Sequence, residues 1–291
     1  MGLRHVFVVS NLTVVLSVCI MSSQLFWDIM DLPKGREKRK REQIMSLVEA
    51  AESLLPRGGL AVEFCCGGGY VGISLAVKRP DAMVILTDMN SVSLSFAKIR
   101  VKRLGLKNVH FKLCELTQIE RDLCEVGRSS LDLPLAERPF DVGIALHACG
   151  GASDTVLKLC RCANASFVVS PCCYGFIKHA VLAGPAPKSV SCNTGDATTD
   201  EDKCSNYPLS DVFRNAGWKS LWFAQLCSQA DRTFWTHDDR SVTHNTSGRL
   251  AMKVIDSDRL LKAREDGFHV EAKFMTPFDA SPKNHILVGA I

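Results

Sequence analysis

The sequence has no large excess of charge of either sign and no internally repeated segment. Its 35 Lys and Arg residues against 31 Asp and Glu residues give a net charge of +4, which is too small to indicate a partner by itself. A hydrophobic fraction of 46% with 20 Gly and 11 Pro in 291 residues excludes a disordered, collagen-like or coiled-coil chain. We therefore expect one large α/β domain with small appendages at most.

The first apolar run is too short to predict a membrane span. Val6–Ile20 is interrupted by Ser10, Asn11 and Thr13, whereas a spanning helix needs about 20 apolar residues. A signal peptide is one interpretation of this segment, and a buried helix or strand is the other. We treat residues 1–31 as a separate apolar N-terminal segment and expect no stable membrane span.

The cysteines lack the dense spacing of a small secreted scaffold, and their number, 13, is odd. Several fall where we expect strands to end: Cys65, Cys66, Cys149, Cys172 and Cys173. This pattern favours reduced thiols in a cytoplasmic protein, with some of them close to the chemistry.

From Leu60 onward, short apolar runs alternate with helical patterns, which predicts a parallel sheet with crossover helices. The predicted strands are 60–64, 84–87, 109–113, 140–146 and 167–170, and the helices between them are 70–78, 92–104 and 155–162. Right-handed crossovers place the carboxyl ends of these strands along one edge, where ligands bind. Residues 268–275 and 285–288 predict a final antiparallel strand pair.

The remaining segments predict helices and polar loops. Helical spacing of apolar residues appears at 43–52, 209–231 and 250–266, whereas 183–206 and 236–248 are polar and predict loop insertions.

A basic run precedes the first of these helices. Lys34–Arg41 carries six cations and one anion in eight residues. Such a run is either a solvated helix face or an electrostatic contact with phosphates. Lys38 and Arg39 are our candidates for contacts with the phosphates of a substrate.

The strongest motif is the glycine-rich turn within Val62–Gly72. A strand ends near Glu63, and a turn containing Gly67 and Gly69 leads into a helix. Glycine is required in such a turn where a ligand approaches the backbone more closely than a Cβ allows. The spacing Gly67-x-Gly69-x-x-Gly72 also satisfies the dinucleotide fingerprint. The turn therefore indicates a nucleoside-containing ligand of either kind.

Acidic residues after three successive strands separate the two kinds of ligand. Glu63 would repel a pyrophosphate but would suit the ammonium of a methionine. Asp88 ends the second strand, where a carboxylate accepts hydrogen bonds from ribose hydroxyls; its alternative role is a helix cap or a turn acid. Glu115 follows the third strand and is placed for an adenine amino group, unless it merely faces solvent.

Together these residues predict a site for S-adenosyl-L-methionine, an aminoacyl cation joined to a nucleoside. The candidate cofactor-binding residues are Glu63, Cys65, Gly67, Gly69, Asp88 and Glu115. The final antiparallel strand pair favours this ligand over NAD, because dinucleotide-binding sheets are normally parallel throughout.

The ends of the fourth and fifth strands supply a second group of candidates. His147 is expected to orient or deprotonate the methyl acceptor, because imidazole titrates near neutral pH, and Cys149 is a second catalytic candidate. The acceptor pocket would be lined by Cys172, Cys173, Tyr174 and Phe176, with the two aromatic rings available for stacking.

Two other interpretations of these strand ends remain open. One is simple packing of small residues at tight turns. The other is a zinc site made of His147, Cys149, Cys172 and Cys173. A His-x-Cys sequence followed by an adjacent cysteine pair is a poor spacing for tetrahedral ligands, so we predict no metal.

These motifs together resemble one family. The strings Leu146–Gly150 and Ser170–Ile177, the turn Glu63–Gly69, and the segments Leu32–Arg36 and Ser281–Asn284 are similar to the methyltransferase-like domain of glutathione S-transferase C-terminal domain-containing protein. The family's helical transferase-like module is absent from the sequence, so glutathione binding is not implied.

The resemblance implies an α/β, Rossmann-like class I methyltransferase fold over residues 32–291. Its sheet would have seven strands, mostly parallel, with a C-terminal antiparallel hairpin, and its cofactor would be S-adenosyl-L-methionine. Cys65 departs from the wider pattern, which has glycine at that position of the turn.

A more distant resemblance concerns the substrate. Gly151–Asp154 follows the His-x-Cys-Gly string in the manner of tRNA 2′-O-methyltransferases. With the basic run Lys34–Arg41, this likeness favours RNA as the methyl acceptor, through an O or N atom. The alternative function is a catalytically inactive methyltransferase fold that serves as an interaction protein.

Overall fold

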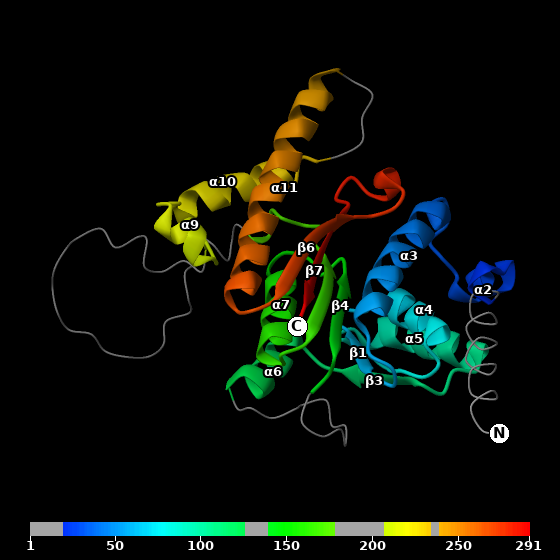
Figure 1. Ribbon diagram of the computed structural model, residues 1–291. Helices are drawn as coiled ribbons and strands as arrows, with labels where there is room; N and C mark the ends of the chain where they lie inside the picture. The colour runs from blue at the N-terminus through cyan, green and yellow to red at the C-terminus, as the bar shows by residue number, and fades with distance from the viewer. Residues whose placement is uncertain (1–19, 126–138, 178–206, 234–238) are drawn as a thin grey trace, which may run out of the picture.

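The computed structural model describes residues 20–125, 139–177, 207–233 and 239–291, and they form a sheet between two layers of helices (Figure 1). The strand order is β3-β2-β1-β4-β5-β7-β6. The strands are β1 (Leu60–Glu63), β2 (Met83–Asp88), β3 (Val109–Leu113), β4 (Val142–Leu146), β5 (Ser166–Ser170), β6 (His269–Phe274) and β7 (His285–Ala290).

The central strands consist of apolar runs because both of their faces are covered. β1, β4 and β5 are buried along their whole length, whereas the edge strand β6 is mostly exposed. β1 to β5 pair in parallel, and β7 runs antiparallel to both β5 and β6. The predicted seven-stranded sheet with a C-terminal antiparallel pair is thereby confirmed.

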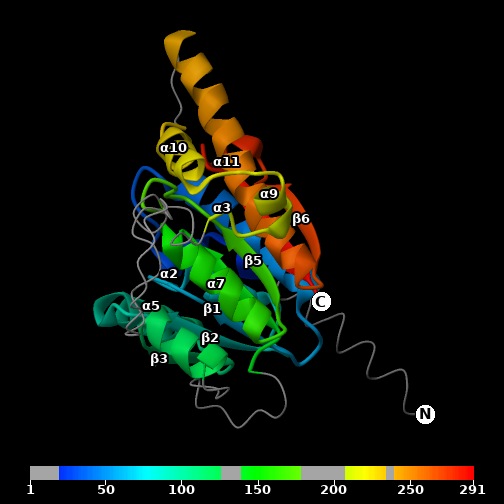
Figure 2. The same cartoon turned by 90° about the vertical axis from the view of Figure 1, so that its left-hand side faces the viewer.

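Each face of the sheet has its own helices and its own apolar core (Figures 1 and 2). One face carries α2 (Gln24–Met30), α3 (Glu37–Leu54), α4 (Tyr70–Lys78) and α5 (Ser91–Leu104). The other carries α6 (Leu116–Glu120), the π-helical turn η1 (Arg121–Glu125), α7 (Gly151–Cys162) and the lower part of α11 (Asp239–Glu265). The short helix α9 (Asp211–Asn215) and α10 (Ser220–Ala230) pack against α11 in a third apolar cluster.

Two predictions about the flanking segments need correction or restriction. α11 begins at Asp239, so the loop predicted at 236–248 is wrong from 239 onward. The loop predicted at 183–206 lies outside the described residues, as do residues 1–19 of the apolar N-terminal segment. Within 20–31, α2 buries Phe26, Trp27 and Met30 against the domain. No helix in the described parts of the chain is apolar over a length that would cross a bilayer.

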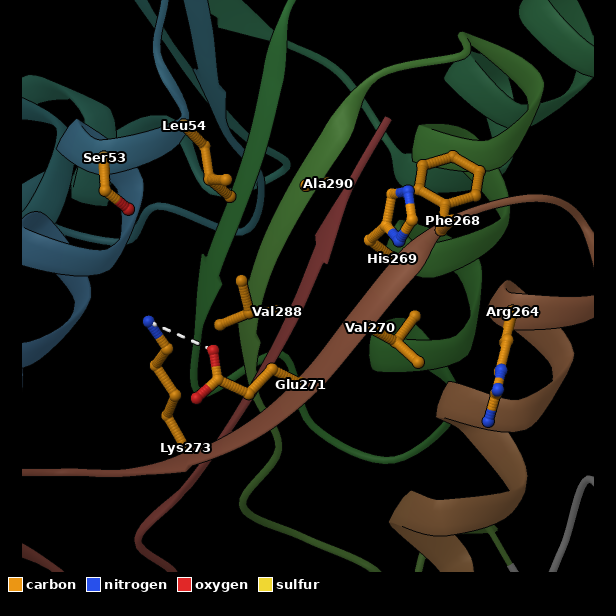
Figure 3. Close-up of a pocket in the computed structure, with 10 residues that line it drawn as sticks. All are labelled: Ser53, Leu54, Arg264, Phe268, His269, Val270, Glu271, Lys273, Val288 and Ala290. Carbon is orange, nitrogen blue, oxygen red and sulfur yellow. Dashed lines mark ion pairs between the residues drawn. The ribbon is translucent and has the colours of Figure 1, made fainter.

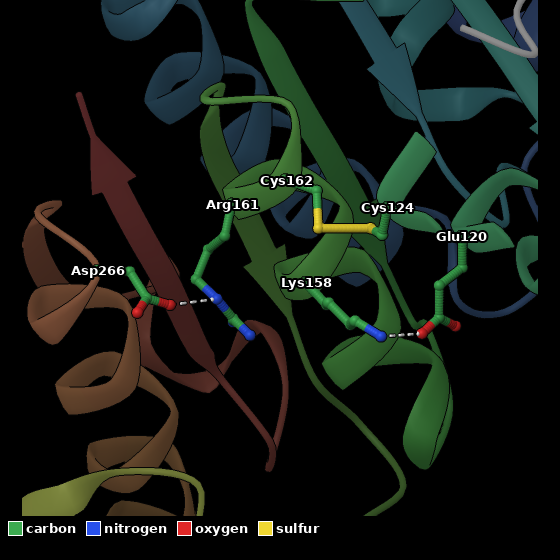
Figure 4. The surroundings of a disulfide bond; sticks show 6 residues. All are labelled: Glu120, Cys124, Lys158, Arg161, Cys162 and Asp266. Carbon is green, nitrogen blue, oxygen red and sulfur yellow. Dashed lines mark hydrogen bonds and ion pairs between the residues drawn. A yellow bond between two sulfur atoms is a disulfide. The ribbon is translucent and has the colours of Figure 1, made fainter. Parts of the chain in front are cut away.

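The prediction of reduced cysteines is wrong for one pair. Cys124 after α6 and Cys162 at the end of α7 form a disulfide, flanked by the ion pairs Lys158–Glu120 and Arg161–Asp266 (Figure 4). The two elements pack side by side, so the bond links neighbours that are distant in sequence.

A buried ionic network joins α11 to the sheet. The guanidinium of Arg259 is fully buried and contacts Asp154 of α7 at 2.7 Å and Asp256 of its own helix at 3.1 Å. Asp256 Oδ2 lies 2.6 Å from His285 Nδ1 in β7 and accepts a hydrogen bond of 2.6 Å from the hydroxyl of Tyr174. One buried arginine therefore neutralises the buried Asp256 and the partly buried Asp154.

We expect Arg259→Met to destabilise the fold by about 3–5 kcal/mol, because it leaves buried carboxylates without their cation. The free energy of unfolding in urea measures the loss. Arg264→Met is the matched control, since Arg264 is exposed on the same helix. Equal effects of the two substitutions would contradict a special role for the buried network.

Candidate active site at the carboxyl edge of the sheet

The glycine-rich turn between β1 and α4 has left-handed backbone at three positions. Cys65, Gly67 and Gly69 have φ values of 51°, 52° and 72°. A Cβ at Gly67 would meet nothing within 4 Å, whereas a Cβ at Gly69 would lie 2.7 Å from Leu86 Cδ1. The turn is thus packed tightly against β2 behind Gly69 and open in front of Gly67. An open backbone surface of this kind admits a ligand.

Glu63 lies behind this turn. Its side chain is buried, with 3% exposed, and its Oε2 accepts a hydrogen bond of 2.7 Å from Gly72 N in the first turn of α4. Burial raises the pKa of Glu63 from 4.5 to about 7, against the opposing effects of the bond from Gly72 and the charge of Lys40. The hydrogen bond from Gly72 N fixes the start of α4. The sequence predicted a different role for Glu63, a direct contact with the ammonium of a ligand.

Asp88 holds the turn from the end of β2. Its Oδ2 accepts a hydrogen bond of 2.7 Å from Gly67 N, and its Oδ1 accepts one of 2.8 Å from Asn90 N. Asn90 itself caps α5, so Asp88 is not the helix cap, but its bond from Asn90 N is that of a turn acid, which was the other alternative considered for it. The carboxylate is half-buried beside the open face of the turn.

Glu115 extends the row of acids to the third strand. It is exposed two residues beyond the end of β3, directly before α6, and its Oε2 accepts a bond of 3.3 Å from the Thr117 hydroxyl. β3 pairs with β2 so that Leu113 lies opposite Asp88. The three acids therefore follow adjacent strands at one edge of the sheet, as predicted.

Arg100 supports the same turn from α5, and the sequence analysis missed it. Its Nη1 donates to Gly68 O at 3.1 Å and its Nε donates to Met30 O at 2.7 Å. The guanidinium also lies 4.6 Å from the ring centroid of Tyr70. A single basic residue in an amphipathic helix gives no sequence signal of such a role.

His147 lies at the end of β4 with a left-handed backbone, φ 65°. Its amide donates to Ser170 O at 3.3 Å, which joins the ends of β4 and β5, and its Nε2 lies 3.2 Å from Gln43 Oε1. Burial, followed by the charge of Lys40, lowers the pKa of His147 to about 4. The imidazole is therefore neutral at physiological pH.

The helix α3 packs over the ends of β4 and β5, and the basic residues of its first turns face in different directions. Lys38 and Arg39 are exposed, with 90% of the Lys38 side chain accessible. Lys40 turns inward, where burial lowers its pKa and the charges of Glu63 and Cys172 oppose that effect. Arg41 lies over the ring of Trp27 at 4.5 Å. Lys40 and Gln43 thus lie at the candidate site. Nothing in the sequence distinguishes them from the exposed residues of the same helix.

Three cysteines meet where β4 and β5 end. Cys149 Sγ lies 3.3 Å from Cys172 Sγ, which lies 3.5 Å from Cys173 Sγ. Cys149 is exposed and the other two are half-buried. Burial raises the pKa of the Cys149 and Cys172 thiols above the ordinary value of 9.0. The predicted juxtaposition of these strand ends is found in the structure.

The two aromatic candidates differ. Tyr174 is fully buried, its hydroxyl donates to Asp256, and its amide donates to Asp231 Oδ1 at 2.8 Å. The prediction that Tyr174 stacks on a substrate is therefore wrong, because its ring is part of the interior. Phe176 is 66% exposed beside Gly150 and remains the candidate for stacking.

Two cavities lie away from these residues. One, of about 570 Å³, is lined by Leu54, Val288 and residues of the exposed strand β6, including the ion pair Lys273–Glu271 (Figure 3). The other, of about 560 Å³, lies between α6, α7 and α11 and is lined in part by Tyr207. Neither cavity includes a candidate cofactor-binding or catalytic residue, so the open edge described above remains the candidate site.

Known proteins share this domain. Residues 39–180 match a family described as a methyltransferase domain. The chain is 35% identical over 260 residues to the glutathione S-transferase C-terminal domain-containing protein homolog of Drosophila melanogaster, covering 89% of this chain and 37% of that protein. It is 33% identical over 261 residues to the corresponding Homo sapiens protein, covering 89% and 34%. The chain thus spans little more than a third of these relatives, and the predicted resemblance is confirmed.

One solved structure aligns along the whole chain. The SAH-bound methyltransferase PaMTH1 of Podospora anserina covers 100% of this chain and 96% of its own, with 11% identity and a TM-score of 0.45.

The raised pKa of Glu63 predicts a pH-dependent stability. In the unfolded chain this acid ionises above about 4.5, and in the folded chain only near 7. Unfolding therefore releases a proton between these values, so rising pH lowers the free energy of unfolding, by roughly 3 kcal/mol at most. Glu63→Gln removes this contribution. Between pH 5 and pH 8 we therefore expect the free energy of unfolding of the variant to rise relative to that of the wild type by the same amount.

Urea unfolding at several pH values measures both profiles. Their difference isolates Glu63, because other groups such as His147 titrate in both proteins. Glu49→Gln, which changes an exposed acid of α3, should keep the wild-type profile. Parallel profiles for the wild type and Glu63→Gln would show that Glu63 is ionised when buried.

Proposed function

We propose that this chain is an S-adenosyl-L-methionine-dependent methyltransferase acting at the carboxyl edge of its sheet, and the match of residues 39–180 to a methyltransferase domain family supports this. The observation that carries the proposal is the glycine-rich turn, which Asp88 holds from one side while a Cβ-free, open surface at Gly67 faces outward. Turn, acids and strand ends lie on the edge where ligands of open α/β sheets bind.

The residues present fit the proposed cofactor. The turn of Cys65, Gly67 and Gly69 would receive the amino-acid part, Asp88 the ribose hydroxyls and Glu115 the adenine amino group. When bound, the cofactor supplies an electrophilic methyl group on a sulfonium. Glu63 acts as a positioning residue, because its carboxylate holds Gly72 N rather than facing the open side of the turn.

The methyl acceptor would lie at the ends of β4 and β5. His147 is neutral and held against Gln43, so it suits an orienting hydrogen bond better than proton abstraction. Its lowered pKa makes it a weak base. Positioning of the two reactants is then the main source of catalysis, and such positioning lowers a barrier by about 7–11 kcal/mol at best.

Asp88→Asn tests the cofactor site. The substitution removes a charged acceptor of ribose hydroxyls, and we expect the affinity for S-adenosyl-L-methionine, measured by calorimetry, to fall by about tenfold to a hundredfold. Glu49→Gln should bind as the wild type does. Absence of binding heat with the wild type would favour the alternative function, an inactive methyltransferase fold that serves in interactions.

RNA is the proposed acceptor class. Lys38 and Arg39 are exposed at the start of α3, the helix whose Lys40 and Gln43 reach the site, so phosphates bound there would lie beside the acceptor pocket. Phe176 offers an exposed ring for stacking a base. Eight of the ten described cysteines are free thiols, which supports a cytoplasmic location, whereas the Cys124–Cys162 disulfide is of a kind found mainly in oxidising compartments.

Replacing Lys38 and Arg39 together by Gln should weaken RNA binding and reduce its salt dependence. Binding releases fewer counterions from the RNA when fewer phosphates are contacted. The slope of log affinity against log salt should change by about 0.7 per contact for a single strand. Lys253→Gln with Arg264→Gln removes the same charge from exposed positions of α11. Equal salt slopes for the two double variants would contradict a phosphate contact on α3.

A further inference from the structure

The three sulfur atoms of Cys149, Cys172 and Cys173 form a compact group. All three Sγ atoms lie within 4.8 Å of one another. Among the described residues, no other group of three or more His, Cys, Asp or Glu side chains converges in this way. The methyl-transfer chemistry proposed above uses none of these sulfurs directly, so their convergence needs its own explanation.

The spacing of the sulfurs fits a tetrahedral thiolate site. Zinc–sulfur bonds of about 2.3 Å in tetrahedral geometry place the sulfurs about 3.8 Å apart. The distances of 3.3 Å from Cys149 to Cys172 and 3.5 Å from Cys172 to Cys173 approach this value. The remaining distance, from Cys149 to Cys173, is within 4.8 Å.

The two loops that carry the cysteines are fixed to each other and to the domain. Gly150 N donates to Cys173 O at 3.0 Å, which ties the end of β4 to the end of β5. Asp231 accepts hydrogen bonds from the amides of Tyr174 and Gly175 at 2.8 and 2.7 Å. The backbone around all three sulfurs is therefore held in place before any ligand binds, as a binding site requires.

The surrounding charges favour an anionic complex. Three thiolates and one divalent cation carry a net charge of −1. Lys40 interacts electrostatically with Cys172, and Lys283 interacts with Cys149. The Lys283 ammonium is itself held 2.6 Å from Asp231 Oδ1. These cations offset the charge of the complex.

We propose that Cys149, Cys172 and Cys173 bind one zinc ion through their thiolates. Because Cys149 is exposed, the fourth coordination position is accessible to water or to a substrate donor atom, as in zinc sites with three protein ligands. His147 is not a member of the group, and its Nε2 faces Gln43. The sequence-based expectation of no metal is thereby revised, because the fold supplies the convergence that the linear spacing lacks.

Metal binding by the full chain tests this proposal without any methyl donor. The reduced, metal-free protein is titrated with Co²⁺ and then with Zn²⁺. We expect one equivalent of cobalt with a thiolate-to-cobalt charge-transfer band, and displacement of that cobalt by zinc. Elemental analysis after dialysis should find one zinc per chain.

Two variants locate the ion. Cys149→Ser removes an exposed thiol, so the fold is preserved, and we expect zinc affinity to fall by more than about tenfold with loss of the charge-transfer band. Cys114→Ser, a half-buried cysteine outside the group, should bind as the wild type does. No band in the wild type, or an unchanged band in Cys149→Ser, would overturn the proposal whatever the result of the cofactor titration.

Discussion

Two hydrogen bonds that backbone amides donate to buried or half-buried carboxylates hold the site together. Glu63 at the end of β1 fixes Gly72 N at the start of α4, and Asp88 at the end of β2 fixes Gly67 N within the turn. Glycine adopts the left-handed backbone at Gly67 and Gly69 without strain, and the two bonds fix where the turn lies relative to β1 and β2. The first acid acts from the interior and the second from the open edge of the sheet.

The other half of the candidate site depends on α3. This helix packs across the ends of β4 and β5 and brings Gln43 to His147 and Lys40 to the interior. The same helix presents Lys38 and Arg39 outward. One amphipathic element thus has two distinct faces: its inner face sets the electrostatics at the ends of β4 and β5, and its outer face exposes two positive charges.

The buried network around Arg259 explains why Tyr174 is not a substrate contact. The aromatic ring follows directly after the cysteines of the fifth strand end, but its hydroxyl is drawn to Asp256, whose charge Arg259 balances. The hydrogen bond between Tyr174 and Asp256 anchors α11 next to the end of β5. Because Tyr174 directly follows Cys172 and Cys173 in the chain, the same bond helps to fix the two cysteines. The stability of the helical layer and the geometry of the sulfur group are consequently linked.

The sequence by itself determined which strands and helices follow one another along the chain, the position of the glycine-rich turn, and the acids at or after the ends of the first three strands. Each of these features depends on a local pattern within a short segment. It also placed His147 beside the cysteines of the neighbouring strand. Only the tertiary structure decided which way the side chains face: Glu63 and Tyr174 inward, Lys40 into the site, and three thiols onto one another. Orientation of this kind arises from packing between elements far apart in the chain, and no local pattern encodes it.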